Sequence, residues 1–490
     1  TFFQVIDTLQ QGDTLGVGQL ESPAMRSLLI QMKPETIDHV IQALALIRPA
    51  AASIGAKECF VRRRRGLEET HYVHPCLEPV LRETYGLMLY EDDGLRVIET
   101  MTGMSAPDAD RLRKRIAKHR TEEEAGILAE EFIAGCVRNG IPQAAAAEQW
   151  QQLPKFNRYS FCKSHAVSYG LIAWRSAWLK AHQPLAFWTA VLNNNQGMYP
   201  RRVYVEAVKR SGIEVLLPCV NCSQGPFIIE GDAIRTGLDV IASLDEDLKQ
   251  AILIERGRHG PYRDLADFRR RVAAGPEALA LLIRCGALDF TGNPRPALFL
   301  EADLHDRASG GRAGGVSPLR IPTVSFLRGL TPPARPSAVM LLDAPPELWQ
   351  PSDYPTEQRR RDEWEILGFL TGPPLMSLFR PGLPAGLATS RDLPRLVGRR
   401  VRLAGLVACT QQTVTVDRRY MQFVTLDDEY GLVEVTLFPD ACPASPHLLI
   451  GPYLATGIVE KQYDVISITA QQFELARELG ERDRPPGDRI

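Results

Sequence analysis

The sequence predicts a multidomain protein with a mostly α-helical first part and a small all-β barrel of the OB type near its C-terminal end. Three observations support this fold class. The chain has 490 residues, too many for one hydrophobic core and enough for roughly three domains. Apolar residues recur at helical spacing over about the first 190 residues. Between about 396 and 475 the apolar period changes to two, as in β-strands.

Several capping signals predict helices in the first part of the chain. Ser22-Pro23 begins an apolar stretch with helical spacing. The segment Thr121–Glu124 fits a capping box, and Gly140 is expected to end the helix that follows. Ser164 is expected to cap another long helix, and Pro184 is expected to end it and to start the next one.

Further along the chain the pattern changes three times. Shorter helices with glycine-containing turns are expected up to about residue 300. Residues 305–355 are dense in Gly, Pro and Ser, which is typical of a linker. A single helix is expected over Glu357–Leu370. The short alternating strands that follow, with turns such as Tyr430-Gly431, suggest the OB-type barrel.

Composition and charge exclude several classes of protein. Hydrophobic residues make up 44% and charged residues 24% of the chain, close to the averages of globular proteins. No run of about 18 apolar residues and no signal peptide is evident, so no membrane is expected as a partner. The net charge of −2 argues against a uniformly basic nucleic-acid-binding protein, so phosphate contacts would need local clusters of Lys and Arg.

The nine cysteines are scattered without a disulfide framework, which favours a reducing, cytoplasmic compartment. Only Cys219 and Cys222 form a C-x-x-C pair, and one such pair supplies at most half a zinc site. We therefore expect it to be structural or incidental, and we expect no metal site in the chain. Neither a phosphate-binding P-loop nor a nucleophilic Ser or Cys motif is present.

The segment Lys155–His165, KFNRYSFCKSH, interleaves basic and aromatic side chains ahead of a predicted helix start. Its cations and the N–H groups of the helix start could bind phosphate, and its aromatic rings could stack on bases. In the alternative interpretation the aromatic rings pack inward and the charges are merely solvated. Residue chemistry alone leaves these two alternatives nearly equal.

Three other charged runs are open to a functional and a structural interpretation. Arg111–Arg120 holds seven cationic candidates in ten positions, which is more often a solvated helix face than a phosphate site. The same caution applies to Arg62–Arg65, expected on a loop. Glu91–Asp93 is a poor cradle for two metal ions, because adjacent carboxylates on a helix diverge. Surface or hydrogen-bonding roles are expected for these three acids.

A series of motifs, in the same order as in the family, resembles bacterial C-family DNA polymerase III alpha subunits. The matching segments are Gly12–Ser22 (GDTLGVGQLES), Leu46–Pro49, His74-Pro75, Tyr85-Gly86, Leu89–Asp92, Leu112–Lys114, Phe156–His165, Trp178–His182 and Glu365–Gly372. The resemblance covers almost the whole chain, from the fingers to the C-terminal region. It extends to the error-prone relatives of these subunits.

The resemblance implies a domain layout. Its five regions are polymerase fingers at 1–190, a clamp-binding and helix-hairpin-helix-like region at 191–304, a linker at 305–355, a connecting helix at 356–395 and an OB-like nucleic-acid-binding domain at 396–480. The function implied is part of a DNA-directed DNA polymerase, in replication or translesion repair. Its partners would be incoming dNTP, primer–template and single-stranded DNA, a sliding clamp and other replisome or mutasome subunits.

The resemblance also assigns candidate binding residues. The incoming nucleotide is assigned to Arg48, Arg113, Lys114, Lys163 and His165. DNA is assigned to Lys155, Arg158, Tyr159 and Lys118. Cations at these positions would stabilise the charge that builds up on a transferring phosphoryl group.

The family uses Mg²⁺, held by palm aspartates that precede the G-D-T motif. This chain begins near that motif and without Met, so a preceding segment is expected and no catalytic residue is assigned here. Without those carboxylates the chain is not expected to polymerise alone. A non-catalytic or split-subunit DNA-binding accessory protein is therefore the alternative function, and a decayed paralogue is a third.

Other departures from the family motifs concern specific contacts. Ala50-Ala51 replaces Gly-Pro, and Gly18 replaces Phe. The hairpin expected near 234–255 lacks the glycines that let backbone N–H groups approach a phosphate, and its acids at 245–247 would repel DNA, so a structural role is expected. No clamp-binding peptide is obvious between 290 and 330. These changes favour a divergent, error-prone or translesion relative.

Overall fold

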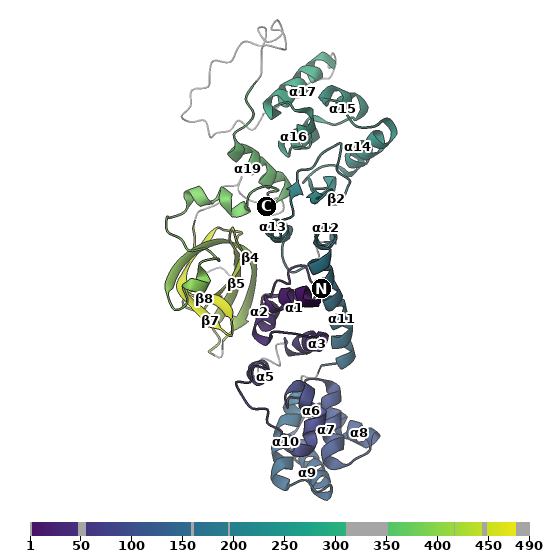
Figure 1. Cartoon of the computed structure of the whole chain (residues 1–490), viewed down its shortest axis with the longest axis vertical. Coiled ribbons are helices and arrows are strands. Elements are labelled where there is room, and N and C mark those ends of the chain that lie inside the picture. The colour runs from purple at the N-terminus through teal and green to yellow at the C-terminus, as the bar shows by residue number, and fades with distance from the viewer. Residues whose placement is uncertain are drawn as a thin grey trace. The chain divides into compact units, whose positions relative to one another are not determined.

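The computed structural model describes residues 2–47, 55–157, 161–194, 197–309, 351–415, 417–442 and 448–476. These residues form two compact units (Figure 1). The first combines residues up to 207 with those from 383 onward, and the second consists of residues 208–382. Every helix in these ranges is too short or too polar to cross a membrane.

The N-terminal part of the first unit is helical, as predicted. Its α-helices are α1 (Phe2–Gln10), α2 (Pro23–Met32), α3 (Ile37–Leu46), α5 (Ala56–Arg64), α6 (Glu78–Leu81), α7 (Glu91–Thr102), α8 (Ala106–Lys118), α9 (Glu122–Arg138), α10 (Gln143–Asn157), α11 (Lys163–His182), α12 (Pro184–Asn194) and α13 (Arg201–Arg210). Short 3-10 turns, η1 (Pro75–Leu77) and η2 (Arg82–Thr84), flank α6. Helices α7 to α10 enclose a hydrophobic core of their own, formed by Val97, Met101, Leu112, Ile116, Leu128, Phe132 and Leu153 among others.

Two of the predicted caps hold and one differs in detail. The Ser22 hydroxyl accepts the N–H of Met25 and caps α2. The Thr121 hydroxyl accepts the N–H of Glu124 at the start of α9. The carboxylate of Glu124, however, accepts the N–H of Arg120 instead of that of Thr121, so the reciprocal half of the capping box is displaced by one residue. Helix α9 ends at Arg138, just before Gly140 with φ +83°.

Helix α11 begins one residue earlier than the predicted cap. Its N-cap is Cys162, so Ser164 lies inside the helix, and the prediction of Ser164 as the cap is wrong. Pro184 starts α12 as expected. The buried face of α11 carries small residues, and a Cβ on Gly170 would lie 2.5 Å from Cγ1 of Ile41 in α3. Close approach of α11 to α3 therefore requires glycine at this position.

The larger apolar side chains of α11 do not form its core face. Leu171, Ile172, Trp178 and Leu179 are exposed in this structure, while the small side chains of the helix are buried. The helical spacing of apolar residues over about the first 190 residues predicted this helix correctly but not the face that packs inward. Small side chains are buried here because they permit the short distance between helix axes.

The second unit contains a small sheet that sequence periodicity did not predict. Strands β1 (Val215–Leu216), β2 (Ile228–Glu230) and β3 (Ala233–Arg235) are ordered β1-β3-β2, with β1 parallel and β2 antiparallel to β3. Strands this short are below the length at which alternation can be recognised. The helices that follow are α14 (Glu246–His259), α15 (Leu265–Arg271), α16 (Pro276–Arg284), α17 (Arg295–Ser309) and α19 (Thr356–Leu367).

The linker prediction is only partly within the described residues. Residues 305–309 belong to α17 instead of a linker, and 310–350 lie outside the described residues. The helix predicted over Glu357–Leu370 is α19, which ends three residues earlier because Gly368 takes the left-handed conformation at its C-cap.

The C-terminal strands close into a five-stranded barrel, as predicted for an OB-like fold. They are β4 (Arg400–Val414), β5 (Tyr420–Asp427), β6 (Leu432–Leu437), β7 (Tyr453–Gln462) and β8 (Val465–Leu475), in the order β4-β5-β6-β8-β7. All neighbouring pairs are antiparallel except β6 and β8. The interior includes Leu403, Val424, Leu426, Val435, Leu437, Ala455, Val459 and Ile468. The fold class is therefore confirmed.

Candidate nucleotide and nucleic-acid interface

The described part of the basic and aromatic segment is anchored to the start of α7. The N–H of Phe161 donates to the carbonyl of Leu89 (3.3 Å), and the N–H of Glu91 donates to the carbonyl of Phe161 (2.9 Å). These two bonds hold Phe161, two residues before α11, beside the N-terminus of α7. The first turn of α11 therefore has a fixed position next to Tyr90.

Lys163 and His165 lie together on this first turn. The Lys163 ammonium is 5.2 Å from the centre of the Tyr90 ring and 3.7 Å from a carboxylate oxygen of Glu83. The exposed His165 ring lies 4.4 Å from the Tyr169 ring and 5.5 Å from the Phe161 ring. Both side chains thus lie at a helix N-terminus, where N–H groups and the helix dipole favour an anion.

In the segment Lys155–His165 some aromatic rings pack inward and others are exposed, so each of the two interpretations left open for this segment holds in part. Phe156 is buried and packs inward, whereas Tyr169 and His165 are exposed. Lys155 is exposed on the last turn of α10. The candidates Arg158 and Tyr159, and also Arg48, lie outside the described residues.

The second group of candidates lies on α8. Arg113 and Lys114 both bind Asp110, at 2.9 and 2.6 Å, and hydrogen bonds from Lys114 and Arg113 lower the pKa of that carboxyl. The Lys114 side chain is 60% exposed and that of Arg113 only 18%. Lys118 is exposed at the end of the helix. Among the described residues no hydrogen bond or ion pair joins these cations to the first turn of α11.

Of the acidic triplet Glu91–Asp93, Asp93 closes the N-terminal cap of α7. The Asp93 carboxylate accepts the N–H groups of Leu89 (2.9 Å) and Tyr90 (2.8 Å). Burial raises the pKa of Asp93 and that of the Tyr90 hydroxyl. The expected hydrogen-bonding role is confirmed for Asp93.

No group of three or more His, Cys, Asp or Glu side chains in the described ranges could hold a metal ion. Cys219 is buried and Cys222 exposed, and both are free thiols. Burial and the neighbouring Cys219 raise the pKa of the Cys222 thiol. The described part of the chain therefore offers no ligand set that fits the Mg²⁺ expected for the family.

The arginine run 62–65 has a structural role that was not predicted. The first three arginines belong to α5, so the prediction of a loop is wrong. Arg64 donates to the carbonyls of Met32 (2.7 Å) and Lys33 (2.8 Å), and Arg65 donates to that of Gln31 (2.6 Å). These guanidinium groups pair the last carbonyls of α2, which have no partner within the helix.

Two further residues that were not singled out fix the Gly12–Ser22 motif. Lys180 is buried and binds the Asp13 carboxylate (2.7 Å) and carbonyl (2.8 Å), with its ammonium 4.9 Å from the Trp188 ring. Glu21 accepts the N–H groups of Gly16 and Met198 and the Tyr204 hydroxyl. The resemblance pointed to the motifs that contain them, but no spacing in the sequence could reveal these contacts.

The barrel carries exposed aromatic side chains. Tyr420, Phe423 and Phe438 are exposed on or next to β5 and β6. The Arg391 guanidinium lies 4.1 Å from the centre of the Tyr430 ring. Exposed rings beside cations are typical of surfaces that stack on single-stranded nucleic acid.

Comparison with known proteins defines the class of this chain. The profile of the bacterial DNA polymerase III alpha subunit finger domain matches residues 3–140, and a helix-hairpin-helix profile matches residues 212–298. The first region contains α1 to α9, and the second contains α14 to α16. The chain is thus similar to a polymerase finger domain over its N-terminal part and to a helix-hairpin-helix region further along.

The relatives are named polymerases. An error-prone DNA polymerase of Symbiobacterium thermophilum is 29% identical over 96% of this chain and 46% of its own length. A DNA polymerase III subunit alpha of Aquifex aeolicus is 30% identical over 91% of this chain and 36% of its own length. An error-prone DNA polymerase of Anaeromyxobacter dehalogenans is 32% identical over 98% of this chain and 41% of its own length.

The resemblance to bacterial C-family DNA polymerase III alpha subunits and their error-prone relatives is therefore confirmed over most of the chain. The chain spans less than half the length of these three relatives. The boundaries of the five predicted regions and the individual site residues stay predictions.

Proposed function

We propose that this chain is part of a DNA-directed DNA polymerase and binds the incoming dNTP and primer–template DNA. The observation that carries the proposal is its similarity to named DNA polymerases over 91% to 98% of its length. The geometry of the α11 first turn supports it. Replication and translesion repair are both consistent with the names of the relatives.

In this proposal Lys163 and His165 bind the triphosphate of the incoming nucleotide. Both lie on the first turn of α11 and reach solvent, so an anion there would meet two side chains and the free N–H groups of the helix. Arg113, Lys114 and Arg48 are the other proposed nucleotide contacts. Cations positioned in this way stabilise charge on a transferring phosphoryl group.

DNA contacts are proposed for Lys155, Arg158, Tyr159 and Lys118, and for the exposed aromatic side chains of the barrel. The exposed cations on α10 and α8 can neutralise backbone phosphates. The exposed rings of Tyr420 and Phe423 can stack on unpaired bases. Contacts with a sliding clamp and with other replisome or mutasome subunits, and a cytoplasmic location, complete the proposal and rest on the resemblance alone.

The metal step is not assigned to this chain. Mg²⁺ is expected for the family, but the described residues contain no fitting ligand set. We propose that carboxylates elsewhere in the polymerase supply it, so this chain contributes binding and orientation. The second candidate function is a non-catalytic DNA-binding accessory protein. The exposed aromatic side chains of the barrel favour it.

A binding experiment tests the proposal. The affinity of the chain for a fluorescent dNTP is measured in the presence of a primer–template, together with its affinity for the DNA itself. Lys163→Ala should weaken nucleotide binding about tenfold, a change of about 1.4 kcal/mol, and should change DNA binding less than about twofold.

Lys57→Ala is the matched control, since Lys57 is also partly exposed and pairs with one glutamate, Glu58, at 3.3 Å. It should leave nucleotide binding unchanged. DNA binding without any dNTP binding would favour the accessory protein. Equal loss in both variants would contradict the assignment of Lys163.

A further inference from the structure

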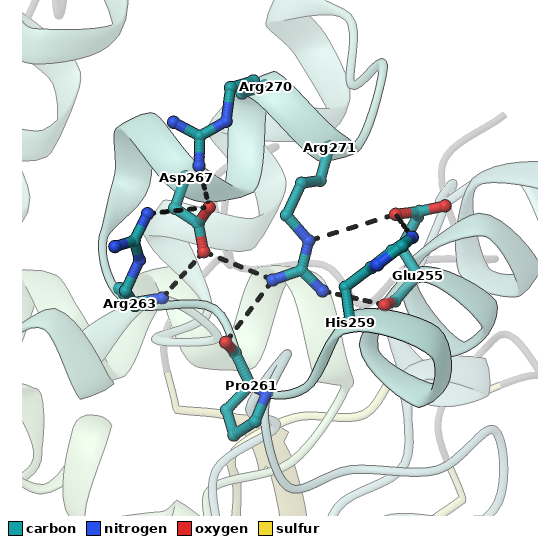
Figure 2. A pocket seen from close by; sticks show the side chains of 7 residues that line it. All are labelled: Glu255, His259, Pro261, Arg263, Asp267, Arg270 and Arg271. Carbon is teal, nitrogen blue, oxygen red and sulfur yellow. Dashed lines mark hydrogen bonds and ion pairs between the residues drawn. The ribbon is translucent and has the colours of Figure 1, made fainter.

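The second unit contains an arginine-lined cleft that the proposed function does not use. It lies between the C-terminal end of α14 and α15, is open to solvent and has a volume of about 550 Å³ (Figure 2). Arg263, Arg270 and Arg271 line it, with Asp267 between them and with Glu255 and His259 on the α14 side. A cleft of this size is large enough for a ligand the size of a nucleotide.

Arg271 is an internal structural group. Its guanidinium donates to the carbonyls of Glu255 and Gly260, each at 2.8 Å, and to the Asp267 carboxylate at 3.2 Å. It also lies 4.3 Å from the centre of the Tyr262 ring. These contacts tie the end of α14 to α15 and leave Arg271 little capacity to bind a ligand.

Asp267 orients the other two arginines. Its side chain is only 6% exposed and accepts the backbone N–H of Arg263 at 3.1 Å. It forms ion pairs with Arg270 and, at 3.7 Å, with Arg263. Hydrogen bonds from the Arg263 backbone and the Arg271 guanidinium lower its pKa, so it stays ionised at neutral pH. One buried carboxylate thus lies among three guanidinium groups.

Arg263 and Arg270 keep most of their donors for solvent. Their side chains are 74% and 62% exposed, and they approach Asp267 from different sides (Figure 2). Each guanidinium has five N–H donors, and Asp267 occupies only a minority of them. Two oriented guanidinium groups with free donors are suited to the oxygens of a phosphate.

The acidic groups that face the cleft are already paired. Besides Asp267, the cleft is lined by Glu255, whose carboxylate lies 3.9 Å from Arg271 Nε and 3.7 Å from His259 Nε2. Three arginines therefore face two carboxylates, which leaves an excess of positive charge. The field at the open side of the cleft favours an anion.

The opposite end of α14 is acidic. Asp245 caps the helix by accepting the N–H groups of Asp247 and Leu248, and Glu246 is in the first turn. Ser243 takes the left-handed conformation (φ +63°) in the turn before the helix. These acids disfavour a phosphate at that turn, whereas the other end of α14 leads to the arginine cleft.

We propose that Arg263 and Arg270 bind a backbone phosphate of DNA at the α14–α15 turn. This inference rests on the proposed function in one respect, that the chain binds DNA. In this proposal one phosphate binds both exposed guanidinium groups, which Asp267 holds through its ion pairs, and Arg271 in turn holds Asp267. The contact carries no base information, so it should act equally on all sequences.

The test compares DNA binding by the full chain and by the double variant Arg263→Gln/Arg270→Gln. Affinity for a fluorescent duplex with a single-stranded overhang is measured at several salt concentrations. The variant should bind about 3- to 10-fold more weakly near 0.1 M salt, and the slope of log K against log salt should fall by about 1. Arg263→Lys/Arg270→Lys keeps the charge and should recover part of the loss.

Arg258→Gln combined with Arg138→Gln removes the same charge from two exposed arginines outside the cleft and is the matched control. It should leave the slope unchanged. An equal effect of the control, or an unchanged slope in the cleft variant, would overturn the proposal. Thermal unfolding of every variant shows whether the fold is intact, and Arg271 still pairs Asp267 in all of them.

Two further outcomes separate the sources of phosphate and the two proposals. Titration with pyrophosphate at constant ionic strength reports binding of a free anion. The cleft variant could lose pyrophosphate binding and still bind DNA as the wild type does. That result would assign the site to free phosphate and overturn the DNA contact. If the wild-type chain binds no DNA at any salt concentration, the proposed function fails as well, whereas DNA binding with no effect of the cleft variant contradicts only this inference.

Discussion

The two arginine-rich helices of the first unit, α5 and α8, differ in what their cations contact. At the end of α5, Arg64 and the C-cap residue Arg65 donate to backbone carbonyls at the end of α2. On α8, Arg113 and Lys114 pair with a carboxylate one turn away on the same helix. A basic run is therefore structural where its side chains donate to backbone carbonyls of another segment. It is available for ligands where its side chains pair with exposed carboxylates on the same helix.

Arg64→Ala should have the largest effect on stability. The Arg64 side chain is 8% exposed and also contacts His39 Nε2 (2.7 Å) and the Tyr85 hydroxyl (3.0 Å). Its loss leaves the carbonyls of Met32 and Lys33 without this donor, at a cost of about 2–4 kcal/mol in the free energy of unfolding. Urea denaturation measures the change.

Arg62→Ala is the control for that experiment, because Arg62 is 45% exposed and, among the described residues, forms its ion pair with Glu68. Its effect should be below about 1 kcal/mol. If both variants lost the same stability, burial of Arg64 against the α2 carbonyls would not explain the difference between α5 and α8.

Lys180→Met should have the next largest effect and extends the comparison to a buried lysine. The ammonium of Lys180 binds the carbonyls of Asp13 and Leu15, and burial lowers its pKa. The variant keeps the packing of the side-chain stem but leaves those carbonyls without their donor, which should cost about 1–3 kcal/mol. Thermal unfolding monitored by circular dichroism provides the measurement. A variant as stable as the wild type would show that water replaces the ammonium there.

A smaller, pH-dependent effect is expected from Glu68, the acid beside α5. Hydrogen bonds from Arg62, Arg63 and Cys59 lower its pKa from 4.5 to about 2. Because the pKa is lower in the folded state, the stabilisation is fully present above about pH 4.5 and is lost as the pH falls toward 2. The difference in unfolding free energy between wild type and Glu68→Gln should therefore shrink over that interval. A constant difference would contradict the pairing.

The smallest effect on stability is expected on α8. Lys114→Ala removes an exposed ion pair and should change the unfolding free energy by less than about 0.5 kcal/mol. If the nucleotide assignment holds, the same variant should weaken dNTP binding measurably. The control is Arg111→Ala, because Arg111 pairs with Asp108 on the same helix. It shows whether loss of any positive charge on α8 weakens dNTP binding. A large loss of stability in Lys114→Ala would place α8 in the same structural class as α5.

Local sequence signals predicted most of the elements. Ser22, Thr121 and Gly140 act within a few residues, so the ends of α2 and α9 could be inferred from short segments. The barrel followed from the period of two between 396 and 475. The sheet β1-β3-β2 was missed because its strands have only two or three residues each.

The candidate site was predicted only as a set of motifs. The resemblance named Lys163, His165 and the α8 cations, and the structure gives each described one a position and a partner. The resemblance could not predict that Arg113 is largely buried whereas Lys114 is exposed. The exposure of a side chain depends on neighbours outside the motif. The Asp267 cleft likewise needed the turn that brings α14 beside α15.

The sequence by itself determined the helical and barrel regions, the family resemblance and the positions of the basic runs. These depend on periodicity, caps and motifs that act over a few residues. Only the tertiary structure decided which cations are structural. Arg64 and Lys180 meet their carbonyl partners across 31 and 167 residues of sequence, and hydrogen bonds between distant segments form only once packing has brought those segments together.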